Sequence, residues 1–108
     1  MKRDNILSMI GLAKAGGNLV SGEFSTEDSI RKGKARLVIV AADASDNTKK
    51  LFTNKCKYYG VPMALYSSKE EIGSMLGYEV RTSLAVTDDG IADSLIEKLH
   101  DRNISFIS

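Results

Sequence analysis

The sequence predicts an α/β fold in which helices cover both faces of a mostly parallel or mixed sheet. First, the apolar pattern changes regularly from helical spacing to short apolar runs and back. Second, a glycine or a capping residue stands at nearly every change. Third, "ARLVIVAA" is apolar except for Arg36, which is typical of a strand buried on both faces. Strands that alternate with helices indicate a sheet covered on both sides.

The N-terminal third predicts a helix, a short strand and a second helix. The first helix ends at Gly16-Gly17, and "NLVSG" is the strand that follows. The second helix is expected over Ser25 to Lys32, with Ser25 as its N-cap and Asp28 as a variant of the capping box. Gly33 is expected to end it. The apolar stripe of the first helix consists of Ile6, Leu7, Met9, Ile10 and Ala13.

The middle of the chain predicts two more helices and two more strands. After "ARLVIVAA", Ser45 is expected to cap a helix that Gly60 ends, and "VPMALY" is the next strand. Two overlapping capping boxes then begin a helix that ends at Gly77. The boxes pair Ser67 with Glu70 and Ser68 with Glu71. The apolar stripe of the helix after Ser45 consists of Leu51, Phe52, Cys56 and Tyr59, and that of the helix after the capping boxes consists of Ile72, Met75 and Leu76.

The C-terminal part predicts a fourth strand and a fifth helix. "TSLAVTD" is the strand, and Asp88-Asp89-Gly90 turns the chain into the helix. "NISFIS" is either an extra edge strand or a frayed tail, and its alternation favours the strand only weakly. The predicted order is α-β-α-β-α-β-α-β-α. The apolar stripe of the last helix consists of Ile91, Leu95, Ile96 and Leu99.

Length and composition predict one globular domain over residues 1–108. The chain has 43% hydrophobic and 27% charged residues and a single proline, which is ordinary for a folded protein and argues against linkers. One cysteine cannot form an internal disulfide, and the apolar runs are too short for a membrane span. The expected location is the cytoplasm. Because the net charge is +1, any attraction to nucleic acid must come from local clusters.

Candidate catalytic and metal-binding residues have simpler structural explanations. His100 has no second ligand at metal spacing, and Cys56 falls on an apolar helix stripe. Asp43 follows a buried strand, where α/β proteins often place functional groups, but its position also suits a cap. No phosphate-binding glycine loop or nucleophile elbow is present. We therefore expect no enzyme activity, no metal and no cofactor.

Two groups of basic residues are candidates for phosphate contact. Four cations lie within six residues and are expected beside an open helix N-terminus, where backbone N–H groups also attract anions. A second group spreads over the helix after Ser45, where a solvated face is the simpler interpretation. The first group consists of Arg31, Lys32, Lys34 and Arg36, and the second consists of Lys49, Lys50, Lys55 and Lys57.

"VSGEFSTEDSIRKGKARLVIVAADASDNTKKLFTNKCKYYGVP", followed by "LGYEVRTSLAV", resembles the ribosomal L-seven-Ae / kink-turn RNA-binding superfamily. The resemblance covers Arg3 to Leu99 and is closest to its small bacterial YlxQ-like branch, for which "DASDNTKK…KCKYYGVP" is specific. It implies a three-layer αβα sandwich around a four-stranded mixed sheet. It also implies a module that grips kink-turn RNA, where sheared G·A pairs bend the duplex sharply and expose base edges that A-form RNA hides.

The resemblance also implies site residues. Gly22 lets the backbone approach the RNA, and Lys32, preceded by Arg31, neutralises phosphate. The loop Tyr78 to Ser83 supplies the apolar contact to an extruded base, with Val80 and Arg81 at its tip. Where the family has asparagine, glutamate and lysine, this chain has Phe24, Ser25 and Asp28, so Glu23 is the candidate acceptor for a guanine N–H.

Two of these departures leave alternatives open. Phe24 either stacks on a base or packs under the helix, and packing is favoured. Asp28 places a negative charge where family members often have a positive one, and it would repel a nearby phosphate.

These observations predict a non-catalytic, monomeric protein that binds structured RNA, either ribosomal or regulatory, and neither DNA nor membranes. One alternative is a protein-interaction adaptor that kept the fold and lost RNA binding. Another is a relative of the accessory substrate-binding domains of ribose methyltransferases. Fold alone does not decide between these classes.

Overall fold

The computed structural model describes residues 4–107, so residues 1–3 and 108 of the expected domain lie outside the described part. Within it, five helices and five strands alternate along the chain, which confirms the predicted order. The elements are α1 (Asn5–Ala15), β1 (Leu19–Ser21), α2 (Glu23–Arg31), β2 (Leu37–Val40), α3 (Asp46–Tyr59), β3 (Met63–Leu65), α4 (Lys69–Leu76), β4 (Ser83–Val86), α5 (Asp89–Asp101) and β5 (Phe106–Ile107).

The strands form one mixed sheet in the order β1-β4-β2-β3-β5. Only the β2–β3 pair is parallel; the β1–β4, β2–β4 and β3–β5 pairs are antiparallel. The expected count of four strands is wrong, because Phe106 pairs with Ala64 and Ile107 with Met63 to add an edge strand. This decides the alternative for "NISFIS" in favour of the strand, as far as residue 107.

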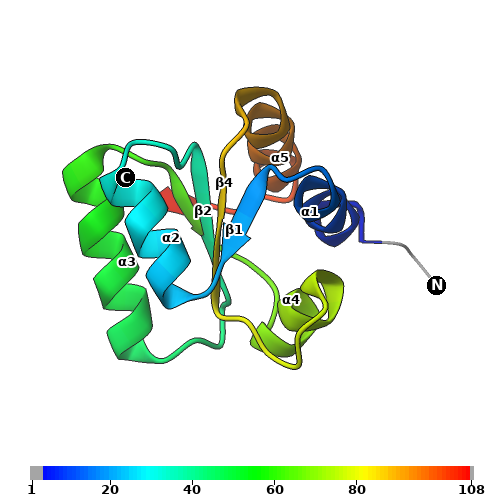
Figure 1. The fold of residues 1–108 in the computed structure, drawn as a ribbon, viewed down its shortest axis with the longest axis horizontal. Coiled ribbons are helices and arrows are strands. Elements are labelled where there is room, and N and C mark those ends of the chain that lie inside the picture. Colours follow the sequence, from blue (N-terminus) through cyan, green and yellow to red (C-terminus); the bar gives the residue numbers. More distant parts are fainter. Residues whose placement is uncertain (1–3, 108) are drawn as a thin grey trace.

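Helices cover both faces of the sheet, so the predicted three-layer sandwich is confirmed. Figure 1 shows α2 and α3 on one face and α1, α4 and α5 on the other. The interior strands β2 and β4 are buried along their whole length, and for β2 this confirms the prediction from the apolar run that contains Arg36. The largest fully buried side chains include Phe52 of α3, Ile72 and Leu76 of α4, and Leu95 and Leu99 of α5.

Four of the five described helices begin with a side chain that caps them. Asp4 accepts hydrogen bonds from backbone N–H groups at the start of α1, and Ser45, Ser68 and Asp88 do the same for α3, α4 and α5. Of the two overlapping capping boxes, the structure uses the one that begins at Ser68. These caps fix where each helix enters the sandwich.

Helix α2 begins differently, and the prediction that Ser25 caps it is wrong. The helix starts at Glu23, its N-cap is Gly22, and no side chain caps it. Gly22 has φ +93°, a conformation that side chains rarely tolerate, so the chain turns straight from β1 into the helix. Ser25 therefore lies inside the first turn, where it cannot adopt the extended backbone of an N-cap.

No helix among residues 4–107 is both long enough and apolar enough to cross a membrane.

Candidate nucleic-acid interface

The loops that carry most of the expected RNA contacts meet at one edge of the sandwich. At the bottom of Figure 1 lie the starts of α2 and α3 and, beside α4, the segment 77–82, which leads into β4. Backbone hydrogen bonds tie these loops together: the Gly22 N–H donates to the Ser83 carbonyl at 3.0 Å, and the Ala41 N–H to the Thr82 carbonyl at 2.9 Å. We call residues 21–25, 41–45, 66–69 and 77–83 the lower edge.

Gly22 and Arg81 lie against each other at this edge. A Cβ atom added at Gly22 would lie only 2.7 Å from Nη1 of Arg81. The absence of a side chain at Gly22 therefore lets the guanidinium lie directly over the turn between β1 and α2. This places a positive charge beside the backbone N–H groups of the first turn of α2, which has no side-chain cap.

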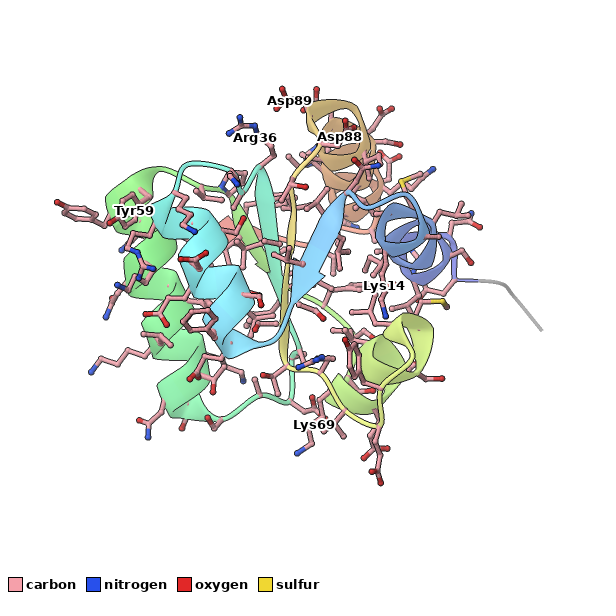
Figure 2. All side chains as sticks on the ribbon, viewed as in Figure 1. Lys14, Arg36, Tyr59, Lys69, Asp88 and Asp89 are labelled. Carbon is pink, nitrogen blue, oxygen red and sulfur yellow. The ribbon has the colours of Figure 1, made fainter. Side chains whose placement is uncertain are left out.

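The same guanidinium stacks on the ring of Tyr78. The Arg81 Cζ lies 3.7 Å from the ring centroid, and the Lys14 Nζ lies 4.7 Å from it. Lys14, between α1 and α4 in Figure 2, also donates a hydrogen bond to the Leu76 carbonyl. The hydrogen bond from Arg81, together with the charge of Lys14, lowers the pKa of Tyr78 below its usual value. Two cations and one ring thus hold the loop.

Of Val80 and Arg81, the two residues expected at the tip of this loop, only Val80 is exposed. Val80 is 49% exposed and offers an apolar side chain at the lower edge, whereas Arg81 is half-buried and folds back. Helix α4 holds the tip closely, because a Cβ atom added at Gly73 would lie 2.7 Å from the Val80 Cα. In addition, the Arg81 N–H donates to the Lys69 carbonyl at 2.9 Å; Figure 2 labels Lys69 at this edge.

The first turn of α2 presents Glu23, Phe24 and Ser25 to solvent. Phe24 is 78% exposed, so the favoured expectation that it packs under the helix is wrong. Because α2 starts two residues earlier than expected, its buried face is formed by Thr26, Ser29 and Ile30, and Phe24 points away. The exposed phenyl ring stands beside the uncapped helix start.

Arg31 and Lys32 lie at the other end of α2 from the lower edge. Ten residues separate Lys32 from Gly22, which corresponds to about 15 Å along a helix. The expectation that the cation group lies beside the open helix N-terminus is therefore wrong. Arg31 and Lys32 both contact Asp28, at 2.6 and 3.0 Å, and the hydrogen bond from Lys32 helps lower the pKa of Asp28. Arg36 lies still farther away, paired with Asp89 at the opposite edge (Figure 2).

The candidate catalytic residues keep their structural roles. Cys56 is fully buried, and burial raises the pKa of its thiol to about 12, which keeps it protonated. His100 is exposed. Asp43 accepts a hydrogen bond from the Lys69 N–H at 2.9 Å, so it caps α4 across the lower edge. In the described part of the chain, no three His, Cys, Asp or Glu residues gather as metal ligands would.

Sequence reasoning missed Lys14 and Gly73. Lys14 is far in sequence from the loop it supports, and nothing local marks it. Gly73 did carry a signal, because an isolated glycine inside a helical pattern often marks a close approach of another backbone.

The comparisons with known proteins agree with this fold. A family model described as "Ribosomal protein L7Ae/L30e/S12e/Gadd45 family" matches residues 4–96. The chain is 43% identical over 91 residues to the "RNA-binding protein YlxQ" of Bacillus subtilis, covering 84% of this chain and 91% of that protein. It is 42% identical over 90 residues to the protein of that name in Enterococcus faecium, covering 83% and 86%.

Solved structures show the same architecture. A protein of unknown function from Bacillus halodurans superposes with a TM-score of 0.87 at 28% identity, covering 91% of this chain and 99% of that one. The Giardia lamblia 15.5kD RNA binding protein superposes with a TM-score of 0.76 at 20% identity, covering 94% and 92%, which supports the fold alone. The family match over residues 4–96, the identity to the two YlxQ proteins and the three-layer fold show that this chain belongs to the ribosomal protein L7Ae/L30e/S12e/Gadd45 family and resembles its YlxQ members.

Proposed function

We propose that this protein binds structured RNA at the lower edge and prefers kink-turn RNA to plain duplex. The observation that carries the proposal is the start of α2, which alone among the described helices lacks a side-chain cap. Arg81, the chain neighbour of the exposed Val80, lies against its N-cap Gly22. Uncapped backbone donors bind phosphate or base acceptors, and an exposed apolar side chain suits an unstacked base.

Each residue at this edge has a role in the proposal. Gly22 allows close backbone approach, and Glu23 and Ser25 reach the edges of the G·A pairs. Val80 contacts the extruded base, with Phe24 as a second stacking surface. Arg81 supplies positive charge from its place on Tyr78. Arg31 and Lys32 contact phosphates farther along the RNA, and Asp28 weakens that contact because it pairs with both.

The names of the two YlxQ relatives support RNA as the ligand, since both are called RNA-binding proteins. In this proposal the protein acts as a monomer in the cytoplasm and without catalysis, and its RNA is ribosomal or regulatory. The adaptor alternative has one observation in its favour, the neutralisation of Arg31 and Lys32 by Asp28. In that case Phe24 and Val80 would contact a protein.

A calorimetric titration tests the proposal with two RNAs. The first carries a kink-turn, and the second has its sheared G·A pairs replaced by Watson–Crick pairs. We expect tighter binding to the first, and an affinity that falls with salt by a slope of only a few phosphates. Equal affinity for both RNAs, or no binding to either, contradicts the proposal. If both RNAs bind equally and Val80→Asp abolishes the binding, the lower edge is the RNA-binding surface but it has no preference for kink-turn RNA.

A further inference from the structure

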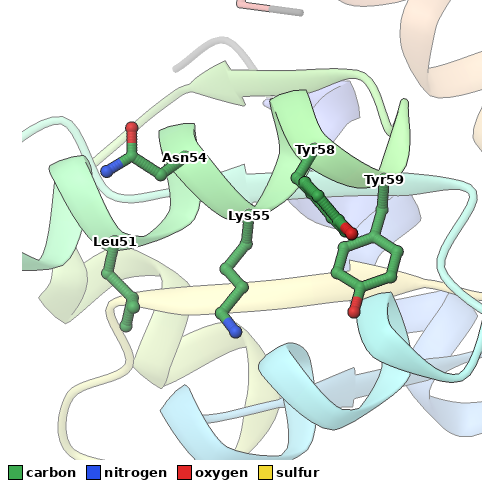
Figure 3. Close-up of a pocket in the computed structure, with 5 residues that line it drawn as sticks. All are labelled: Leu51, Asn54, Lys55, Tyr58 and Tyr59. Atoms are coloured by element: carbon green, nitrogen blue, oxygen red, sulfur yellow. The ribbon is translucent and has the colours of Figure 1, made fainter.

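A groove on the α2/α3 face lies away from the lower edge, and the residues that line it have no role in the proposed function. It is a hollow of about 390 Å³ lined by Leu51, Asn54, Lys55, Tyr58 and Tyr59. Figure 3 shows Leu51, Lys55 and Tyr59, four residues apart on α3, pointing toward α2. A second hollow of about 440 Å³ shares Tyr59 and continues past Gly33 toward Arg36. We call the two together the tyrosine groove.

Two aromatic rings stand exposed in this groove. Tyr58 is 83% exposed and Tyr59 is 41% exposed, and their ring centroids lie 4.9 Å apart at an interplanar angle of 76°. Tyr59 was expected on the buried stripe of its helix, yet it lies at the surface beyond the last buried position, Cys56. The two rings meet edge to face, so each presents its own face, on which a planar group can stack.

The groove runs through the most basic part of the chain. Residues 27–36 and 49–59 contain eight of the 15 Lys and Arg residues but only two of the 14 Asp and Glu residues. Lys55 forms an ion pair with Glu27 at 3.5 Å, which a phosphate would replace, and this contact makes α2 and α3 neighbours at that level. Both helices start at the lower edge and run the same way (Figure 1), so Arg31, one turn beyond Glu27, lies at the level of Tyr59.

This combination fits a nucleic-acid strand better than a protein. Tyrosine and arginine are common at both kinds of interface, but lysine is depleted at protein–protein interfaces, whereas basic residues beside aromatic rings are the usual surface for single strands. Asn54 adds an amide that can pair with base edges. The excess of positive charge is complementary to phosphate.

We propose that the tyrosine groove binds a single-stranded RNA segment, with bases stacked on Tyr58 and Tyr59 and phosphates on Lys55 and Arg31. The proposal rests on the proposed function only in that this segment is continuous with the RNA held at the lower edge. Helix α3 has 14 residues, so it is about 21 Å long. A stacked strand advances about 3.4 Å per nucleotide. The length of α3 therefore accommodates a single-stranded RNA tail of about six nucleotides.

The first experiment uses a single-stranded RNA of about eight nucleotides without any kink-turn, so that it is independent of the lower edge. We expect weak binding that decreases with salt, and a loss of about ten-fold in Tyr58→Ala and in Lys55→Gln. Leu12→Ala and Lys98→Gln are the matched controls, because both positions lie in helices on the other face of the sheet. They should bind like the unchanged protein.

The second experiment compares a kink-turn RNA with and without a tail of about eight nucleotides. The tail should tighten binding, and Tyr58→Ala should remove that gain while leaving the tail-free affinity unchanged. No binding of the single strand, or equal binding by Tyr58→Ala and Leu12→Ala, overturns the inference. So does a Tyr58-dependent self-association in sedimentation, which would make the groove a protein contact. Loss of kink-turn preference with single-strand binding intact rejects only the proposed function.

Discussion

Arg81 joins two parts of the lower edge that are far apart in sequence. Its guanidinium covers Gly22 and stacks on Tyr78, so it shapes the edge as well as charging it. The sequence resemblance assigned both Arg81 and Lys32 to the surface that contacts RNA. The structure separates them, because Lys32 is 57% exposed at the far end of α2 whereas Arg81 is half-buried.

We therefore expect Arg81→Ala and Lys32→Ala to differ in thermal stability. Arg81→Ala should lower the free energy of unfolding by about 1 kcal/mol, as expected for the loss of a cation–π contact, and should also weaken RNA binding. Lys32→Ala should weaken binding and leave the melting temperature nearly unchanged. Arg81→Lys keeps the charge but loses the planar stack, so it should restore binding only in part. Equal melting temperatures for all three variants would refute the positioning role of Arg81.

Asp28 is the residue at which stability and RNA binding oppose each other. Its carboxylate contacts Arg31 and Lys32, and its pKa is lowered, first by the hydrogen bond from Lys32. Because the pKa is lowered in the folded state, ionised Asp28 stabilises the protein at any pH above the ordinary pKa of 3.8. This stabilisation is lost as the pH falls through the folded-state pKa.

Replacing Asp28 should therefore tighten RNA binding. Asp28→Asn frees both cations, and Asp28→Lys adds a third, so affinity and its salt slope should rise in that order. Both variants should melt at a slightly lower temperature than the unchanged protein. Titrations at two salt concentrations, with melting curves, measure both effects. Unchanged affinity in both variants would show that RNA does not reach this end of α2.

At the scale of the elements, the starts of the helices show what the sequence could and could not predict. Ser45, Ser68 and Asp88 were predicted to begin helices, because their side chains fit the cap chemistry and they precede apolar stripes. The start of α2 was misplaced because Gly22 begins the helix through its backbone conformation, which patterns of side-chain caps do not reveal. The exposure of Phe24 was missed for the same reason.

The α4–loop contact gives a prediction at this scale. Gly73→Ala would place a Cβ atom 2.7 Å from the Val80 Cα and 2.9 Å from the Glu79 carbonyl oxygen, so backbone must move. We expect a loss of about 1–3 kcal/mol in the free energy of unfolding and weaker RNA binding as Val80 is displaced.

Gly11→Ala is the control, since its new Cβ would meet the flexible end of Met75 at 3.0 Å. Chemical denaturation and RNA titration of both variants provide the comparison. The contact would be unimportant if the folded Gly73→Ala protein bound RNA as tightly as the Gly11→Ala protein.

At the scale of the whole molecule, the start of α1 and the end of α5 meet at Tyr66. The Tyr66 hydroxyl donates to Asp4 Oδ2 at 2.7 Å and accepts from Arg102 Nη1 at 2.5 Å, which links the start of α1 to the end of α5. Burial, followed by the contact with Asp4, raises the pKa of Tyr66 to about 12 from 10.0.

Tyr66→Phe should therefore lower the free energy of unfolding by about 1 kcal/mol at neutral pH. Because the folded-state pKa is raised, the contribution of Tyr66 is fully present below pH 10 and is lost as the pH rises toward about 12. The difference between the two proteins should shrink over that interval. Tyr58→Phe, at an exposed position, is the control and should change neither the free energy of unfolding nor its dependence on pH. A difference that stays constant from pH 9 to pH 12 would contradict this account.

Local sequence patterns were enough to predict the layered fold, but they predicted the residues of the lower edge only in part. Alternating periodicity was enough for the layers, because burying each apolar face requires helices on both sides of the strands. The fifth strand was favoured only weakly and left out of the expected count, because Phe106–Ile107 is too short for its alternation to be distinctive. The stack of Arg81, Tyr78 and Lys14 depends on contacts between residues far apart in sequence, which no local pattern encodes.

The most direct test of the lower edge as the RNA interface is residue-by-residue mapping in solution. Tail-free kink-turn RNA is added to isotope-labelled protein, and the change in each backbone amide chemical shift is measured. We predict that the largest changes fall on residues 22–26 and 78–83, with small changes across α1 and α5. Largest changes on α1 and α5, or no changes at saturating RNA, would contradict the proposal that RNA binds at the uncapped start of α2.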